Sequence, residues 1–212
     1  VGSENVTIGC GAGENNQGVK SIAVGYQSGL TGQGDYGVAI GNQAGQTNQG
    51  VQSIAIGPSA GSNNQSASSI AIGVNAGINE QKISSISIGA NAGSYNQGTG
   101  NIAIGELSGY WEQSEDCIAI GNNSAETYQS KGSISIGSLS GSISQGQYSL
   151  AIGRSSGQTN QGNSCIALGR NSGRDNQTQG AMAFGFSAGR NYQGQSSVAL
   201  GTSAGRNTQG QF

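Results

Sequence analysis

The chain has 212 residues, of which 40 are glycine and only 18 are charged (8 Lys and Arg, 10 Asp and Glu), giving a formal net charge of −2 with no histidine. Nearly one glycine in five excludes an ordinary helical domain, because each glycine in a helix interior costs about 1 kcal/mol relative to alanine. Without histidine the chain lacks the commonest general base and metal ligand, so we expect no enzyme, no metal site and no cofactor.

A repeat of 16 residues runs through the chain. Glycine recurs at that interval from Gly9 to Gly201, and units counted from Asn5 give 13 repeats (13 × 16 = 208 residues) after four residues that match the end of a preceding unit. Repeat positions are numbered 1 to 16 from Asn5. The consensus Ser-Ile-Ala-Ile-Gly-x-x-Ala-Gly-x-x-Asn-Gln-Gly-x-x is nearly intact at Ser53-Ile54-Ala55-Ile56-Gly57. This regularity argues against the disorder that a composition rich in Gly, Ser, Asn and Gln otherwise suggests.

Each 16-residue repeat predicts one short strand at positions 1 to 4. The first of these strands covers residues 5–8 and the last covers residues 197–200. Positions 2 and 4 are always apolar, and the glycine at position 5 indicates a turn that needs positive φ or close backbone approach. One unit cannot fold alone, but stacked units pair each strand with its copy about 4.8 Å away. We therefore predict an all-β parallel β-solenoid (β-roll) of 13 coils with 16 residues per coil, forming one domain over residues 1–212.

The alternating pattern leaves two assignments of the strand faces. We expect positions 2 and 4 to fill the core, so that Ile54 and Ile56 are fully buried and Ile104→Asn costs several kcal/mol. The small residues at positions 1 and 3 then face outward as a flat Ser and Ala strip, which favours close packing by another surface. The opposite assignment exposes an aliphatic ridge that must be buried between chains. Both assignments indicate self-association.

Position 13 is glutamine in every unit. A buried amide stacked on its own copies can donate and accept hydrogen bonds along the stack. We predict a structural ladder, in preference to a ligand site, from the glutamines at position 13: Gln17, Gln33, Gln49, Gln65, Gln81, Gln97, Gln113, Gln129, Gln145, Gln161, Gln177, Gln193 and Gln209.

Aromatic residues gather in three neighbouring units. Tyr95 and Trp111 share position 11, Tyr110 precedes Trp111, and Tyr128 follows at position 12, with acidic residues around them. Exposed aromatic rings beside carboxylates are a candidate contact patch for a glycan or a protein. The alternative is that these turn aromatics pack on one another.

Other short motifs carry weaker expectations. Asn64, Asn122 and Asn176 begin Asn-x-Ser/Thr sequons in turns, where a glycan has room, while Asn5 begins one at a strand start. The chance meeting of these residue types is an equal alternative. Cys117 and Cys165 share position 1 three coils apart, roughly 14 Å, which is too far for a disulfide.

Charge is divided along the chain. Residues 1–126 hold 9 acidic and 2 basic residues (net −7), while residues 127–212 hold 1 acidic and 6 basic residues (net +5), with Arg174, Arg190 and Arg206 stacked at position 10. This division favours head-to-tail association of oppositely charged halves. The overall charge of −2 argues against a nucleic-acid partner, and no apolar run approaches the ~20 residues of a membrane span.

The unit Ser-Ile-Ala-Ile-Gly-x-x-Ala-Gly, as at Ser69-Ile70-Ala71-Ile72-Gly73, resembles the head repeats of trimeric autotransporter adhesins and the repeat arrays of phage and large-virus fibre proteins. The resemblance covers all 13 units. It implies an extracellular, cell-surface or virion-surface location and a stalk or adhesive fibre.

Two functions follow as expectations. The first is a structural, self-associating fibre or stalk whose partner is another copy of the chain. The second is an adhesin or receptor-binding shaft that contacts a glycan or a cell-surface receptor. Ice binding ranks last, because Thr31, Thr47, Thr127 and Thr159 are isolated and form no continuous threonine column.

Overall fold

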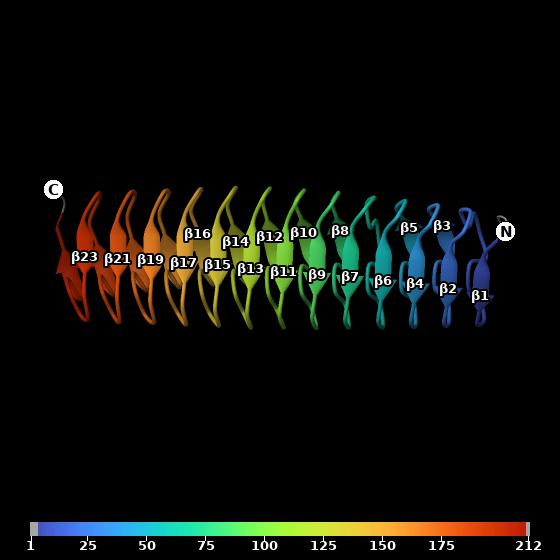
Figure 1. The fold of residues 1–212 in the computed structure, drawn as a ribbon, viewed down its shortest axis with the longest axis horizontal. Helices are drawn as coiled ribbons and strands as arrows, with labels where there is room; N and C mark the ends of the chain where they lie inside the picture. Colours follow the sequence, from blue (N-terminus) through green and yellow to red (C-terminus); the bar gives the residue numbers. More distant parts are fainter. Residues whose placement is uncertain (1–3, 211–212) are drawn as a thin grey trace. The chain divides into compact units, whose positions relative to one another are not determined.

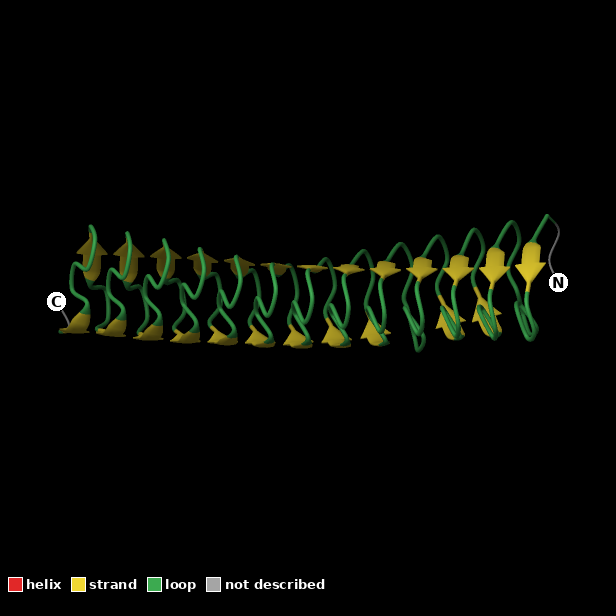
Figure 2. Cartoon of the chain, turned by 90° about the horizontal axis from the view of Figure 1, so that it is seen from below, coloured by secondary structure: helices red, strands yellow, loops and turns green. Residues whose placement is uncertain are grey.

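The computed structural model describes residues 4–210, which contain 24 β-strands of three residues each and no helix. The fold is a parallel β-solenoid of about 13 turns with one turn for every 16 residues, so the predicted fold class is confirmed. The coils fall into two compact halves of several repeats each, residues 4–107 and residues 108–210, which are called the first unit and the second unit from here on. In each unit two layers of strands run through successive coils (Figures 1 and 2).

One layer, the aliphatic sheet, contains the strands at repeat positions 2 to 4. In the first unit these are β1 (Val6–Ile8), β2 (Ile22–Val24), β4 (Val38–Ile40), β6 (Ile54–Ile56), β7 (Ile70–Ile72), β9 (Ile86–Ile88) and β11 (Ile102–Ile104). In the second unit they are β13 (Ile118–Ile120), β15 (Ile134–Ile136), β17 (Leu150–Ile152), β19 (Ile166–Leu168), β21 (Met182–Phe184) and β23 (Val198–Leu200).

The other layer, the glutamine sheet, contains the strands at positions 11 to 13. In the first unit these are β3 (Thr31–Gln33), β5 (Thr47–Gln49), β8 (Asn79–Gln81) and β10 (Tyr95–Gln97). The glutamine sheet is interrupted between β5 and β8, where only isolated bridges join Asn63 to Thr47 and to Asn79. In the second unit they are β12 (Trp111–Gln113), β14 (Thr127–Gln129), β16 (Ile143–Gln145), β18 (Thr159–Gln161), β20 (Asp175–Gln177), β22 (Asn191–Gln193) and β24 (Asn207–Gln209). The sequence pattern did not predict this second strand.

Strands pair in parallel with an offset of exactly one repeat. Ile54 pairs with Ile70 and Ala55 pairs with Ala71, and the same register holds in the second unit. Each column of the repeat is therefore a physical column of stacked side chains, about 4.8 Å apart along the stack.

The expected assignment of the strand faces is wrong. Ala55, at position 3, is fully buried, whereas Ile54 and Ile56 on either side of it are only partly buried. Serines at position 1, such as Ser53, are fully buried as well. Small residues fill the interior and the large aliphatic side chains face outward, so Ile104→Asn would place its amide on the outer face and not in the core.

The interior is too thin for aliphatic side chains. A Cβ atom built on Gly61, at position 9, would lie 3.3 Å from the Ala55 Cβ and 2.5 Å from Gln65 Oε1. The two layers therefore approach so closely that only Ala, Ser, Gly and an extended Gln fit between them. The buried cluster in the first unit consists of alanines from positions 3 and 8, namely Ala39, Ala44, Ala55, Ala60, Ala71 and Ala76.

The invariant glycine at position 5 has a conformational cause. Gly57 has φ of +123°, and a Cβ atom there would lie 2.7 Å from the carbonyl oxygen of Gly73 in the next coil. Both the backbone conformation and the close stacking of the turns therefore require glycine.

Candidate association face and surface sites

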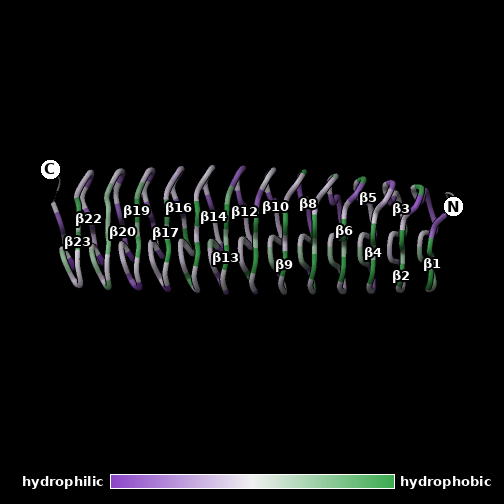
Figure 3. Tube along the Cα trace, in the orientation of Figure 1, coloured by the Kyte–Doolittle hydropathy of each residue, from purple (hydrophilic) through white to green (hydrophobic). Residues whose placement is uncertain are grey.

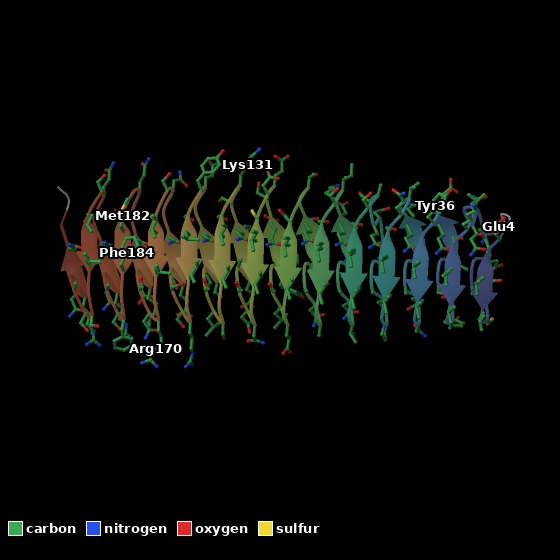
Figure 4. All side chains as sticks on the ribbon, viewed as in Figure 1. Glu4, Tyr36, Lys131, Arg170, Met182 and Phe184 are labelled. Atoms are coloured by element: carbon green, nitrogen blue, oxygen red, sulfur yellow. The ribbon has the colours of Figure 1, made fainter. Side chains whose placement is uncertain are left out.

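The outer face of the aliphatic sheet is apolar along each unit. Positions 2 and 4 carry only Val, Ile, Leu, Met or Phe in all 13 repeats, without one charged or polar residue. The exposed fraction is 37% for Ile40 and Met182 and 41% for Leu168. Hydrophobic colour runs along these strands in Figure 3, and Met182 and Phe184 are seen on β21 in Figure 4. We call the outward side chains at positions 2 and 4 the aliphatic face.

The aliphatic face is large enough to matter for association. The aliphatic sheet has seven strands in the first unit and six in the second. Each strand is about 10 Å long and lies about 4.8 Å from the next, so the faces cover about 340 Å² and about 290 Å². A single contiguous apolar patch on a soluble monomer is typically about 300–600 Å² and is often functional. The larger of the two areas lies within that range and the smaller one close to its lower end.

The glutamines at position 13 lie in the interior. In the second unit the Nε2 atoms of Gln129, Gln145, Gln161 and Gln177 each donate to Oε1 of the glutamine one coil further, at 3.2, 3.2, 3.1 and 3.0 Å. In the first unit such bonds join Gln17 to Gln33 and Gln65 to Gln81.

The same amides also span the interior, a role that the sequence analysis missed. Gln81 Nε2 donates to the carbonyl oxygen of Ile70 at 2.8 Å, and Gln161 Nε2 donates to that of Leu150 at 3.0 Å. Each bond ties a strand of the glutamine sheet to the aliphatic strand of the same coil. Glutamine at this position therefore holds the two layers together.

The candidate aromatic patch is divided between the units. Tyr95 lies in β10 of the first unit and is partly buried. In the second unit the rings of Tyr110 and Trp111 have centroids 6.5 Å apart, and Trp111 pairs in register with Thr127, the neighbour of Tyr128. The exposed fractions are 38% for Trp111 and 51% for Tyr128. The structure thus brings Tyr110 and Trp111 together and leaves a large part of the Trp111 and Tyr128 rings accessible.

Tyr128 also borders a shallow groove of about 330 Å³ whose lining includes Ser130, Ser144 and Asn163. Tyr192, which shares position 12, borders a similar groove of about 260 Å³ with Asn176 and Thr208. Both tyrosines replace the asparagine that is common at position 12, where the backbone is left-handed, with φ of +56° at Tyr128 and +54° at Tyr192.

The candidate glycosylation residues differ in accessibility. Asn64 and Asn122 are exposed and Asn176 is partly buried. Asn64 Oδ1 accepts a hydrogen bond from Asn48 Nδ2 at 3.0 Å, and Asn176 Oδ1 accepts one from Asn160 Nδ2 at 3.1 Å. Asn5 has a buried Nδ2 atom, and its Oδ1 accepts from the Ser21 N–H.

Two of the three cysteines are interior residues. Cys117 and Cys165 replace the buried serine of position 1, and their thiols donate to the carbonyl oxygens of Ser130 and Thr178 at 3.1 and 2.8 Å. Burial raises the pKa of both thiols. Cys10 is exposed.

Charged side chains lie outside the core. Lys131 Nζ is 2.8 Å from Glu115 Oε2 in the neighbouring coil, and this hydrogen bond together with the lysine charge lowers the pKa of Glu115. The same contact raises the pKa of Lys131. Within residues 4–210, no group of three Asp, Glu or Cys residues is arranged to hold a metal ion. That part of the chain also contains no apolar helix of membrane-spanning length.

Comparison with protein-family models, curated proteins and solved structures finds no match for this chain.

Proposed function

We propose that the chain is a structural, self-associating solenoid whose copies pack through the aliphatic face, in a fibre or stalk. The observation that carries the proposal is the unbroken aliphatic face of each unit beside an interior made of Ala, Ser and Gln. The largest apolar side chains of the repeat are only partly removed from water by folding. A second copy is the partner with matching chemistry, since it presents the same columns at the same spacing.

The energetic argument compares burial with the cost of association. Completing the burial of one partly exposed aliphatic side chain is worth up to about 1 kcal/mol. Within one unit, two such side chains in each of six or seven strands offer a gross gain of up to about 12–14 kcal/mol, whereas association costs about 4–15 kcal/mol in lost freedom. A run of six or seven strands can therefore offset that cost, and a patch of a few residues would not.

The setting that we propose is an extracellular, cell or virion surface. Its support is the resemblance of the Ser-Ile-Ala-Ile-Gly unit to adhesin head repeats and fibre arrays, together with a repeat architecture that can be lengthened by adding coils.

Sedimentation of face variants tests the association. The double variant Ile120→Glu/Ile136→Glu places charges on the aliphatic face of the second unit. The matched control is Ser144→Glu/Asn160→Glu at position 12, where Glu80 and Glu112 stand naturally. We expect the wild type and the control to sediment as the same oligomer and the face variant to dissociate. A wild-type chain that remains monomeric at low and high salt would contradict the proposal.

A second candidate function is an adhesin or receptor-binding shaft. The observation that favours it is the accessible ring of Tyr128 beside its polar groove, near the exposed Trp111. Aromatic faces stack on sugar rings while groove hydroxyl and amide groups bind sugar hydroxyls. A glycan array with Trp111→Ala and Tyr128→Ala tests it: signals that are lost in these variants support it, and signals that do not change contradict it.

A further inference from the structure

The lysines and the arginines of the chain differ in whether they pair with a carboxylate. Within residues 4–210 all three lysines lie within 4 Å of a carboxylate: Lys20 near Glu4, Lys82 near Glu80 and Lys131 near Glu115. Of the five arginines in that range, only Arg174 does so, with Nε 2.9 Å from Asp175 Oδ2. The arginines therefore carry net positive charge that the fold does not neutralise.

These arginines flank one turn of the second unit. Arg154 and Arg170 lie at position 6, within the turn that follows the aliphatic strand, and Arg174, Arg190 and Arg206 lie at position 10, where that turn ends. Figure 4 shows Arg170 at this edge of the solenoid, and Lys131 at the opposite edge. We call the five residues the arginine edge.

Backbone hydrogen bonds place the arginines in successive coils. The Asn171 N–H donates to the Arg154 carbonyl and the Ser187 N–H donates to the Arg170 carbonyl, each at 2.9 Å. The Asp175 and Asn191 N–H groups likewise donate to the carbonyls of Arg190 and Arg206. The edge is thus an array of two columns, and neighbours in each column lie one coil apart, about 4.8 Å.

The fold leaves most of the positive charge of this array without a carboxylate partner. Like charges one coil apart repel one another, and residues 153–206 contain Asp175 as the sole carboxylate. The Nε atom of Arg190 is buried and makes no hydrogen bond, and Arg170 is held over the Phe186 ring at 4.6 Å, with its own side chain exposed. A ligand that supplies anionic oxygens along the edge would relieve the repulsion.

We propose that the arginine edge binds an acidic polysaccharide, a linear glycan with sulfate or carboxylate groups. An edge that presents charges at a constant spacing from coil to coil fits an extended polymer that lies along it. At positions 6 and 7 of the same turn, the exposed Thr202 and the partly buried Asn171 offer polar groups that can bind sugar hydroxyls. Base stacking would need a row of exposed aromatic rings, and Phe186 is the only aromatic residue at these positions in residues 153–206, with Arg170 over its ring. The site is separate from the aliphatic face and does not depend on the proposed self-association.

Binding of the full chain to fluorescent dextran sulfate tests the proposal. Uncharged dextran is the control polymer that lacks only the sulfate groups, and polygalacturonate tests a polymer with carboxylate groups. If four arginines displace counterions, affinity should fall roughly 50-fold between about 50 and about 200 mM salt, and roughly 7-fold after two of them are removed. The variant is Arg154→Gln/Arg170→Gln. The matched control is Lys20→Gln/Lys131→Gln, which removes the same charge from paired lysines.

We expect the arginine variant to bind more weakly with the smaller salt dependence, and the lysine control to bind like the wild type. Circular dichroism and sedimentation should match the wild type in both. If the arginine variant and the lysine control lose the same affinity for dextran sulfate, net charge alone explains the binding and the proposal is overturned. Equal or tighter binding of single-stranded oligothymidylate would overturn it in favour of nucleic acid. Loss of self-association in the arginine variant would instead identify the acidic surface of a second copy as the occupant. The face variant Ile120→Glu/Ile136→Glu should still bind dextran sulfate, because the arginine edge is separate from the aliphatic face. Failure of self-association can therefore be told apart from failure of polysaccharide binding.

Discussion

The hydroxyl of Ser135 donates a hydrogen bond of 2.6 Å to Oε1 of Gln145, across the interior of the second unit. Gln145 Nε2 donates in turn to the Ile134 carbonyl at 2.9 Å and to Gln161 Oε1 at 3.2 Å. One buried amide therefore links both layers of its own coil and the next coil. In an interior without large apolar side chains, such amides take the place of hydrophobic contacts between layers.

We expect Gln145→Leu to lower the free energy of unfolding by about 1–3 kcal/mol although it adds apolar volume, because it leaves several buried donors and acceptors with one partner fewer. Chemical denaturation measures the change. Ser135→Ala is the control and should cost less, since alanine occupies the same position in the neighbouring coils at Ala119 and Ala151. A leucine variant as stable as the wild type would contradict the role of the amide.

Ala55→Leu tests the inward position of the small residues. The side chain has no space between the layers, so we expect a loss of about 1–3 kcal/mol or more from overpacking. Ile54→Leu, one residue away on the outer face, should change stability by less than about 0.5 kcal/mol. Urea unfolding of the two variants checks this pair, and the reverse order of effects would restore the assignment with the aliphatic residues inside.

The 16-residue period predicted the parallel solenoid, but it predicted neither the second strand of each coil nor which strand face lies inside. The usual expectation that aliphatic residues fill the interior failed at Ile54 and Ile56, which lie partly buried on the outer face. The deciding signal was present in other columns: Gly at position 9, Ala or Ser at position 8 and Gln at position 13 leave no space for isoleucine. These columns together determine how far apart the two layers lie. The alternation of residues within one strand carries no information about that distance.

The surface sites were predicted in part. The acidic neighbours of Trp111 and the arginine column at position 10 are visible in the sequence, but Arg154 and Arg170 join that column only because a turn brings position 6 beside position 10. The pairing of Lys131 with Glu115 depends on the register between coils, and so does the contrast between paired lysines and unpaired arginines.

The Glu115–Lys131 pair gives a pH-dependent signal. The pKa of Glu115 lies below its ordinary value of 4.5 in the folded chain, so its contribution to stability is present above pH 4.5 and is lost as the pH falls through the lowered pKa. The pKa of Lys131 lies above 10.5, so its contribution is present below that pH and is lost as the pH rises through the raised pKa. Both side chains are about half exposed to solvent, so salt should weaken the effect.

NMR titration of the Glu115 carboxyl measures this effect directly. We expect a midpoint below 4.5 in the wild type and a return towards 4.5 in Lys131→Gln. Raising the salt concentration should move the wild-type midpoint in the same direction. A midpoint that is identical in both proteins would show that the ion pair does not form in solution.

The three thiols should differ in reactivity, because only the thiolate attacks a disulfide reagent and it must be accessible. Burial raises the pKa of Cys117 and Cys165 above 9.0, and both sulfurs lie inside the solenoid, whereas Cys10 is exposed. With a chromogenic disulfide at pH 8 we expect one fast thiol per native chain and three after unfolding in guanidinium. Cys10→Ser should remove the fast phase and leave the two slow thiols. Rapid reaction of all three in the native chain would show that position 1 opens to solvent, and would contradict the closed interior on which the stacking of Ser, Cys and Ala at that position depends.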